Sequence, residues 1–155
     1  MRIWGFVLAG LVLVFDQITK LWALDALLNP PVRIEFLPFW DFVLVWNRGV
    51  SFGLFGGGAI SPLMLAAITG AIALGVAVWL FRARSWWTAV AAGLVFGGAV
   101  GNIIDRLVYG AVVDFVDWHA FGYHWPVFNV ADAGITVGVA VLIAESLFGG
   151  NKDTK

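Results

Sequence analysis

Two aspartates occupy apolar surroundings, where an ionised side chain is costly. Asp114 lies in VVDFV, and Asp132 lies near the start of the apolar run VADAGITVG. Ionisable residues in or beside a membrane-spanning segment are candidates for a functional site by default. Two neighbouring carboxylates can hydrolyse a peptide bond without a metal if the ionised one activates the attacking water and the neutral one donates to the developing oxyanion and the leaving nitrogen. The pair is therefore our first candidate for chemistry.

Both aspartates also have a structural explanation. Asn129 and Asp132 have the spacing of a capping box, in which the N-cap and N3 side chains bond to each other's backbone N–H groups. On local spacing alone, this helix cap is the favoured interpretation of Asp132. The alternative for Asp114 is an exposed strand carboxylate, which the flanking valines and phenylalanine disfavour.

A second group of polar residues lies in GNIIDR. Asn102, Asp105 and Arg106 stand at positions i, i+3 and i+4, so they share one face of a helix. The bland alternative is a polar helix end at the membrane interface, but three converging hydrogen-bonding groups favour the floor of a site. Asn47, in WNRGVSFG, is expected to reach the same side, and Gly49 to serve a turn.

A charged pair interrupts the first apolar segment. Asp16 and Lys20, in DQITK, stand four residues apart on one helical face and can form an ion pair. A structural pair and a role in orienting a site are equally favoured, because charges within a membrane tend to serve both purposes.

Other kinds of chemistry find little support in the sequence. Cysteine is absent, which excludes thiolate nucleophiles and thiolate metal ligands. His119 and His124 are five residues apart without a further ligand pattern, so we expect interfacial side chains there. Ser51 and Ser61 lack the neighbouring base that nucleophilic catalysis requires. We therefore expect no metal and no cofactor.

The composition shows what kind of scaffold must position these residues. Of the 155 residues, 61% are hydrophobic and 12% charged, and the mean hydropathy of +0.93 indicates a membrane protein. Four segments have the roughly 20 apolar residues that a spanning helix needs. They cover about residues 3–24, 60–81, 86–104 and 130–148, and we expect residues 1–155 to form one integral membrane domain. The net charge of −1 gives no reason to expect a nucleic-acid partner.

Basic residues predict the orientation of the four helices. Five of the nine fall on one side of the membrane, at Arg2, Arg82, Arg84, Lys152 and Lys155. By the positive-inside rule, both termini are cytoplasmic, and the connections at about 27–58 and 107–128 lie outside. These connections contain VRIEFL, DFVLVW and AVVDFVDW, whose β-branched and aromatic residues predict a small outer sheet.

Small residues predict how the helices begin and pack. Glycines recur every fourth residue in the third and fourth segments, at Gly93, Gly97, Gly101, Gly134 and Gly138. This spacing favours close helix–helix contact. In addition, Ser61 and Pro62 form a good cap and first-turn pair for the second helix.

Five motifs carry a family resemblance. In order along nearly the whole chain, they are DQITK, NRGVSFG, GGAVGNIIDR, GAVVDF and FNVADAGITVG. Together they resemble the lipoprotein signal peptidases, also called signal peptidase II. The departures are Val50 and Ser51, where small alanines are common in the family, and Ala133-Gly134, where Ser-Ala is common. All of the polar positions are intact.

The resemblance implies an aspartyl endopeptidase of the bacterial inner membrane, with its active site at the periplasmic face. Its substrates would be prolipoproteins that carry a diacylglyceryl-modified cysteine, and cleavage would fall just before that cysteine. The implied fold is an all-α transmembrane four-helix bundle with a small periplasmic β-cradle. Asp114 and Asp132 match the catalytic pair. The substrate-binding or supporting positions are Asp16, Lys20, Asn47, Gly49, Asn102, Asp105, Arg106, Asn129 and Ala131.

The environments of the two aspartates suggest a division of roles. A helix N-terminus favours the ionised form of Asp132, whereas apolar strand neighbours favour the neutral form of Asp114. Our hypothesis is that Asp132 is the general base and Asp114 the general acid. The protein is expected to act as a monomer in contact with membrane lipid.

Two other classes of protein are alternatives. One is a small four-helix ion channel or exporter with an ion path through Asp16, Lys20 and Asp132, and the other is a non-catalytic assembly or chaperone subunit. The polar residues gather at one boundary of the membrane rather than across it, which disfavours an ion path.

Overall fold

A computed structural model describes residues 1–49 and 61–148 of the chain. Its helices are α1 (Arg2–Leu27), α2 (Pro62–Arg82), α3 (Trp86–Tyr109) and α4 (Val130–Phe148). All four are long and apolar enough to cross a membrane, which confirms the predicted spans. The bounds of α4 are those expected, whereas α3 continues five residues beyond the predicted end. Gly110, in the left-handed conformation, ends α3 by donating its N–H to the Arg106 carbonyl.

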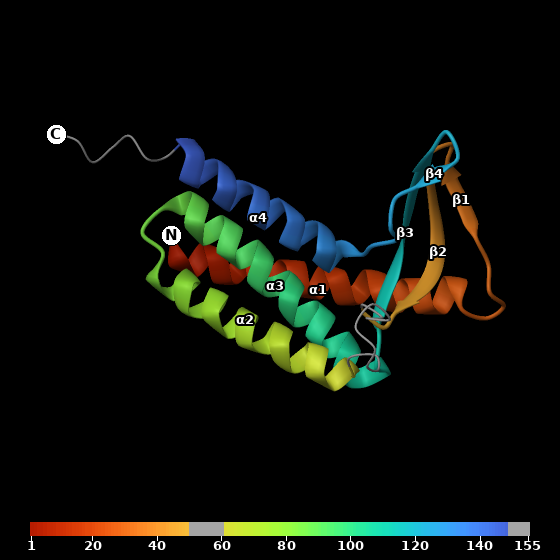
Figure 1. The fold of residues 1–155 in the computed structure, drawn as a ribbon, viewed down its shortest axis with the longest axis horizontal. Helices are drawn as coiled ribbons and strands as arrows, with labels where there is room; N and C mark the ends of the chain where they lie inside the picture. The colour runs from red at the N-terminus through yellow and green to blue at the C-terminus, as the bar shows by residue number, and fades with distance from the viewer. Residues whose placement is uncertain (50–60, 149–155) are drawn as a thin grey trace, which may run out of the picture.

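Helix α3 is the centre of the bundle and contacts α1, α2 and α4 (Figure 1). Its glycines make these contacts close. A Cβ atom at Gly93 or Gly97 would collide with the backbone of Gly5 or Ala9 in α1, and one at Gly138 would collide with α3 at Ala91. The predicted packing role of the glycines is thereby confirmed.

Side-chain caps fix the starts of two helices. Ser61 accepts a hydrogen bond from the Met64 N–H at 3.1 Å, with Pro62 at the first helical position, as predicted. Ser85 caps α3 in the same way and also bonds to Glu145 of α4. Because Glu145 also accepts from the Thr88 hydroxyl at 2.8 Å, it ties the end of α4 to the start of α3.

A four-stranded antiparallel sheet, in the order β1-β2-β3-β4, stands across one end of the bundle (Figure 1). Its strands are β1 (Ile34–Leu37), β2 (Trp40–Asn47), β3 (Val112–Ala120) and β4 (Tyr123–His124). Three of them lie where strands were predicted, and β4 was not expected. The pairing of β2 with β3 sets Asn47 opposite Val112 and Val45 opposite Asp114.

An apolar cluster joins the sheet to the first helix. Ala23 and Leu27, in the last turns of α1, are buried with Phe115 and Val116 of β3. The end of α1 therefore supports the strand that carries Asp114.

Candidate active site

Strand β3 carries Asp114 as its third residue, and this side chain is 1% exposed. Its two carboxylate oxygens accept hydrogen bonds from different side-chain amides, Asn47 at 2.9 Å and Asn129 at 2.6 Å. The exposed-strand alternative for Asp114 is therefore wrong. The flanking valines and phenylalanine are buried with it because β3 lies between β2 and the chain that leads into α4.

Burial raises the pKa of Asp114 to about 6, and the nearby charge of Asp132 acts in the same direction. The hydrogen bonds from Asn47 and Asn129 oppose this shift because they stabilise the ionised form. An acid with such a pKa can exist in either protonation state near neutral pH, as general acid–base chemistry requires.

The first turn of α4 carries Asp132, and the predicted capping box is present. Asn129 Oδ1 accepts from the Asp132 N–H at 2.9 Å, and Asp132 Oδ2 accepts from the Asn129 N–H at 3.4 Å. The other oxygen of Asp132 accepts from the Asn102 side-chain amide at 2.8 Å. The cap leaves this half-buried carboxylate in the site, so the two interpretations of Asp132 are compatible.

Two asparagines connect the aspartates. The side-chain amide of Asn129 donates to Asp114 and also lies 3.2 Å from Asn102 Oδ1. Asn102 in turn donates to Asp132. Both carboxylates thus bond to Asn129, and Asn102 adds a second link between them in the same hydrogen-bond network.

Lys20 of α1 contacts this network through Asn102 and is 2% exposed. Each N–H group of its ammonium has an acceptor. Its Nζ atom lies 2.8 Å from Asp16, 2.7 Å from Asp105 and 3.0 Å from Asn102 Oδ1. An ammonium has three donors, and all three find acceptors. The Lys20 contact fixes which end of the Asn102 amide faces Asp132, so the charged pair of α1 is linked to the site.

The carboxylates beside Lys20 also position the backbone. Asp16 accepts from the Ala131 N–H at 2.8 Å, at the start of α4, and Asp105 accepts from the Val113 N–H at 3.0 Å, beside Asp114. The buried ion cluster therefore holds both of the segments that carry the candidate pair.

Sequence reasoning missed Gln17. Its amide lies 3.2 Å from both Asp16 and Asp105 and bridges α1 to α3. The sequence signal that could have identified Gln17 is its position: it is a further polar residue in the apolar stretch that contains Asp16 and Lys20.

The predicted roles of Asn47 and Gly49 are linked. Asn47 Oδ1 accepts from the Gly49 N–H at 2.9 Å, and Gly49 has a φ of +87°, which favours glycine. This turn orients the amide so that its nitrogen donates to Asp114. The rest of the NRGVSFG motif, from Val50 onward, and the remainder of the first connection through 60 lie outside the described residues.

Arg106 brings a positive charge close to both aspartates. One of its terminal nitrogens donates to the Asn102 carbonyl at 3.3 Å, and its charge interacts with those of Asp132 and Asp114. Its buried Nε finds no acceptor among residues 1–49 and 61–148.

The predicted site residues thus converge at the junction of α1, α3, β3 and α4. His119 and His124 lie elsewhere, on the sheet, where they contact Asp41 and Asp117. In the described part of the chain, no group of three metal-ligating side chains is present.

Four spanning helices with two connected aspartates beneath a small sheet define a membrane protein of the aspartyl-protease class. The chain belongs to the signal peptidase II family. The family model described as "Signal peptidase (SPase) II" matches residues 8–148.

Individual relatives agree with this assignment. A lipoprotein signal peptidase of Methylorubrum extorquens is 51% identical over 87% of this chain and 80% of its own length. Another, of Rhodopseudomonas palustris, is 47% identical over 92% of both chains. A bacterial membrane enzyme solved by the in meso method at 1.9 Å is similar with a TM-score of 0.79 and 32% identity, over 97% of this chain and 94% of that one. The channel interpretation finds no support among these proteins.

Proposed function

We propose that Asp114 and Asp132 together hydrolyse the peptide bond just before the diacylglyceryl-modified cysteine of a prolipoprotein. Membership of the signal peptidase II family gives the reaction class, the removal of signal peptides from lipoproteins by an aspartyl protease. The observation that carries the residue assignment is the link between the two carboxylates through Asn129. A second pair of aspartates, Asp16 and Asp105, is bridged by the Gln17 amide, but both of these carboxylates bind the Lys20 ammonium.

The roles follow from the two environments. Asp132, at the N-terminus of α4 and near Arg106, is favoured as the ionised base. Asp114, whose pKa is raised to about 6 mainly by burial, is favoured as the acid. The two carboxylates titrate as a coupled pair, so the roles describe the dominant protonation state.

Hydrolysis then proceeds with a balanced transfer of protons. Asp132 takes a proton from water while the water oxygen forms a bond to the scissile carbonyl carbon. Asp114 donates its proton to the carbonyl oxygen. When the carbon–nitrogen bond breaks, the leaving nitrogen takes up a proton from Asp132, and the hydroxyl proton of the collapsing intermediate returns to Asp114. Both carboxylates end in their starting states.

The supporting residues hold this geometry. Lys20 orients the Asn102 amide toward Asp132, and Gly49 orients the Asn47 amide toward Asp114. Of the remaining predicted positions, Asp16 and Asp105 hold Lys20, and the Ala131 N–H is held by Asp16.

The proposed setting is the bacterial inner membrane, with both termini cytoplasmic and the site at the periplasmic face. The start of α1, at Arg2, and the turn from α2 to α3, which follows Arg82 and contains Arg84, lie at the end of the bundle opposite the sheet (Figure 1), which supports this orientation. A diacylglyceryl substrate stays in the bilayer, so it would approach the site laterally from the lipid. The enzyme would act as a monomer, with one chain binding one substrate.

Conversion of each aspartate to the isosteric amide tests the proposal. With a diacylglyceryl-modified precursor, Asp114→Asn and Asp132→Asn should each abolish cleavage while the protein remains inserted and folded. Asp25→Asn, which alters an exposed aspartate of α1, is the matched control and should retain activity. Cleavage by either site variant at the wild-type rate would refute the assignment.

A further inference from the structure

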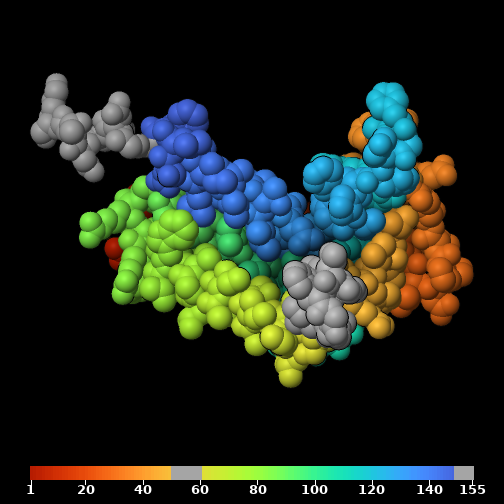
Figure 2. Space-filling view, in the orientation of Figure 1, coloured from red at the N-terminus to blue at the C-terminus, as the bar shows by residue number. Residues whose placement is uncertain are grey.

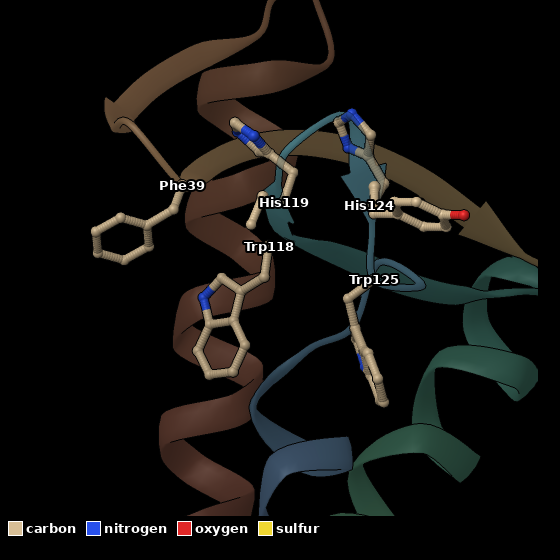
Figure 3. Close-up of a pocket in the computed structure, with 7 residues that line it drawn as sticks. Phe39, Trp118, His119, His124 and Trp125 are labelled. Carbon is tan, nitrogen blue, oxygen red and sulfur yellow. The ribbon is translucent and has the colours of Figure 1, made fainter.

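The far end of the sheet carries a pocket of about 530 Å³ that the proposed proteolysis does not use. We call this end the arm tip. The pocket is lined by Phe39, Trp118, His119, Ala120, Tyr123, His124 and Trp125. The indoles of Trp118 and Trp125 point in the direction in which α4 enters the bundle, and the two imidazoles lie on the opposite side (Figure 3). The pocket therefore has an aromatic end and a polar rim.

The aromatic end faces the region of the bilayer. A notch separates the arm tip from α4 (Figure 2). Because α4 spans the membrane, the side of the sheet that faces the helices lies toward lipid. Trp118 is 48% exposed and Trp125 67% exposed within the protein. Exposed tryptophans at a spanning-helix end are typical of the aromatic belts that contact lipid headgroups.

The hairpin turn has an additional unusual feature. Phe121, at the turn between β3 and β4, has a φ of +53° and is fully exposed. A bulky residue is disfavoured at such a φ, and neither packing nor backbone geometry calls for phenylalanine there. Contact with lipid supplies a reason for this residue.

The polar rim is negatively charged when its imidazoles are neutral. His119 Nε2 lies 3.1 Å from Asp41, and His124 Nδ1 lies 2.9 Å from Asp117. Arg33 donates from Nε to Asp41 and from a terminal nitrogen to Asp117. With neutral imidazoles, this cluster of one cation and two anions has a charge of −1. Glu35 is the next charged group near Arg33 and adds to the negative potential.

The carboxylates also determine what the imidazoles can bind. A neutral imidazole that faces a carboxylate places its hydrogen on that nitrogen, so the second nitrogen is an acceptor. His119 and His124 stack with ring centroids 5.0 Å apart, and both line the pocket. Two acceptors, a negative rim and aromatic faces together suit a primary ammonium group.

We propose that the arm tip binds a zwitterionic phospholipid of the surrounding leaflet that carries a primary ammonium headgroup. The ammonium lies at the imidazole rim, and the glycerol and acyl chains lie along Trp118 and Trp125. An anionic phospholipid would meet the negative rim and is disfavoured. This binding site is separate from the Asp114–Asp132 pair, so failure of either proposal leaves the other intact.

Native mass spectrometry of the full chain in detergent tests the site, with phosphatidylethanolamine and phosphatidylglycerol as probes. Phosphatidylethanolamine should bind about fivefold more tightly, and Trp125→Ala should weaken its binding by about fivefold. The matched control is Trp87→Ala, which removes an exposed tryptophan at the opposite end of the bundle and should have no effect. Equal binding of the two lipids, or equal loss in both variants, would overturn the proposal.

A second measurement tests the location independently of affinity. Because the chain has no cysteine, single spin labels can be attached at Trp125→Cys and, as a control on an exposed strand residue, at Glu35→Cys. In phosphatidylethanolamine-containing nanodiscs, the label at 125 should be more accessible to oxygen and the label at 35 to a water-soluble nickel chelate. Equal nickel accessibility at the two positions would contradict a lipid-facing pocket.

Discussion

Asn129 and Asp132 bond to each other's backbone N–H groups at 2.9 and 3.4 Å, and the same Asn129 donates from its side chain to Asp114 at 2.6 Å. The helix cap and the candidate site therefore share one residue. The cap uses the oxygen of the Asn129 side chain, and the link to Asp114 uses its nitrogen. A substitution that changes only the nitrogen can separate the two roles.

Asn129→Asp is such a substitution. Aspartate caps a helix about as well as asparagine, so the start of α4 should persist. The donor to Asp114 is lost and a second carboxylate takes its place, so we expect kcat to fall by about 10–100-fold. Cleavage of a lipidated precursor measures the effect, and thermal unfolding in detergent checks the fold.

The matched control is Ser61→Ala, which removes the cap of α2 at a distance from the aspartates. It should reduce the free energy of unfolding by about 1 kcal/mol and leave cleavage unchanged. If Asn129→Asp behaves like Ser61→Ala, Asn129 serves only as a cap.

The pH dependence of cleavage should depend on Asn47. With Asp114 as the acid, kcat/KM of the free enzyme should fall as the pH rises through about 6, the pKa of Asp114. The Asn47 hydrogen bond lowers this pKa, so Asn47→Ala should raise it and move the falling limb to higher pH. Measurement of kcat/KM from about pH 4.5 to about pH 9 covers the change.

Arg48→Ala provides the control, since this exposed neighbour does not contact Asp114. Its falling limb should stay in place. If Asp114 instead acts in its ionised form, kcat/KM should rise with pH through its pKa, and Asn47→Ala should move this rising limb to higher pH. The same pKa predicts how stability depends on pH. Because folding raises the pKa of Asp114 from 3.8 to about 6, protonated Asp114 contributes to the free energy of unfolding below about pH 4. This contribution is lost as the pH rises through 6.

Lys20→Met should be strongly destabilising. The substitution leaves Asp16 and Asp105 buried without their cation, and loss of one partner from a buried ion cluster costs about 3–5 kcal/mol. Unfolding in a detergent titration measures the loss. The triple variant Lys20→Met, Asp16→Asn, Asp105→Asn removes the uncompensated charges and should recover part of the stability. If the triple variant is no more stable than Lys20→Met, charge imbalance is not the cause.

The spans and most strands could be predicted because their causes are local. Long apolar runs require a spanning helix, and α4 has the predicted bounds from Val130 to Phe148. The Ser61 cap and the Asn129–Asp132 box likewise depend on residues three positions apart. Family motifs then assigned the polar positions that the fold brings together.

The contacts between distant segments could not be predicted. The Lys20 ammonium meets Asn102 only because the glycines of α3 let it approach α1 closely. The sequence indicated that both residues were polar, but not that the Lys20 contact would orient the Asn102 amide. The same holds for His119 and His124, whose partners Asp41 and Asp117 are set by the pairing of β2, β3 and β4.

The glycines of α3 lead to the last prediction. A Cβ atom at Gly97 would collide with the backbone of Ala9, which cannot move without separating α1 from α3. Gly97→Ala should therefore reduce the free energy of unfolding by about 1–3 kcal/mol. Because separation of α1 from α3 draws Lys20 away from Asn102, cleavage should also fall.

Gly75→Ala is the matched control in α2, where the added methyl group meets open space. It should retain activity and stability, because alanine has the higher helix propensity. Equal stability and activity in the two variants would show that the close approach of α1 and α3 does not determine the site geometry.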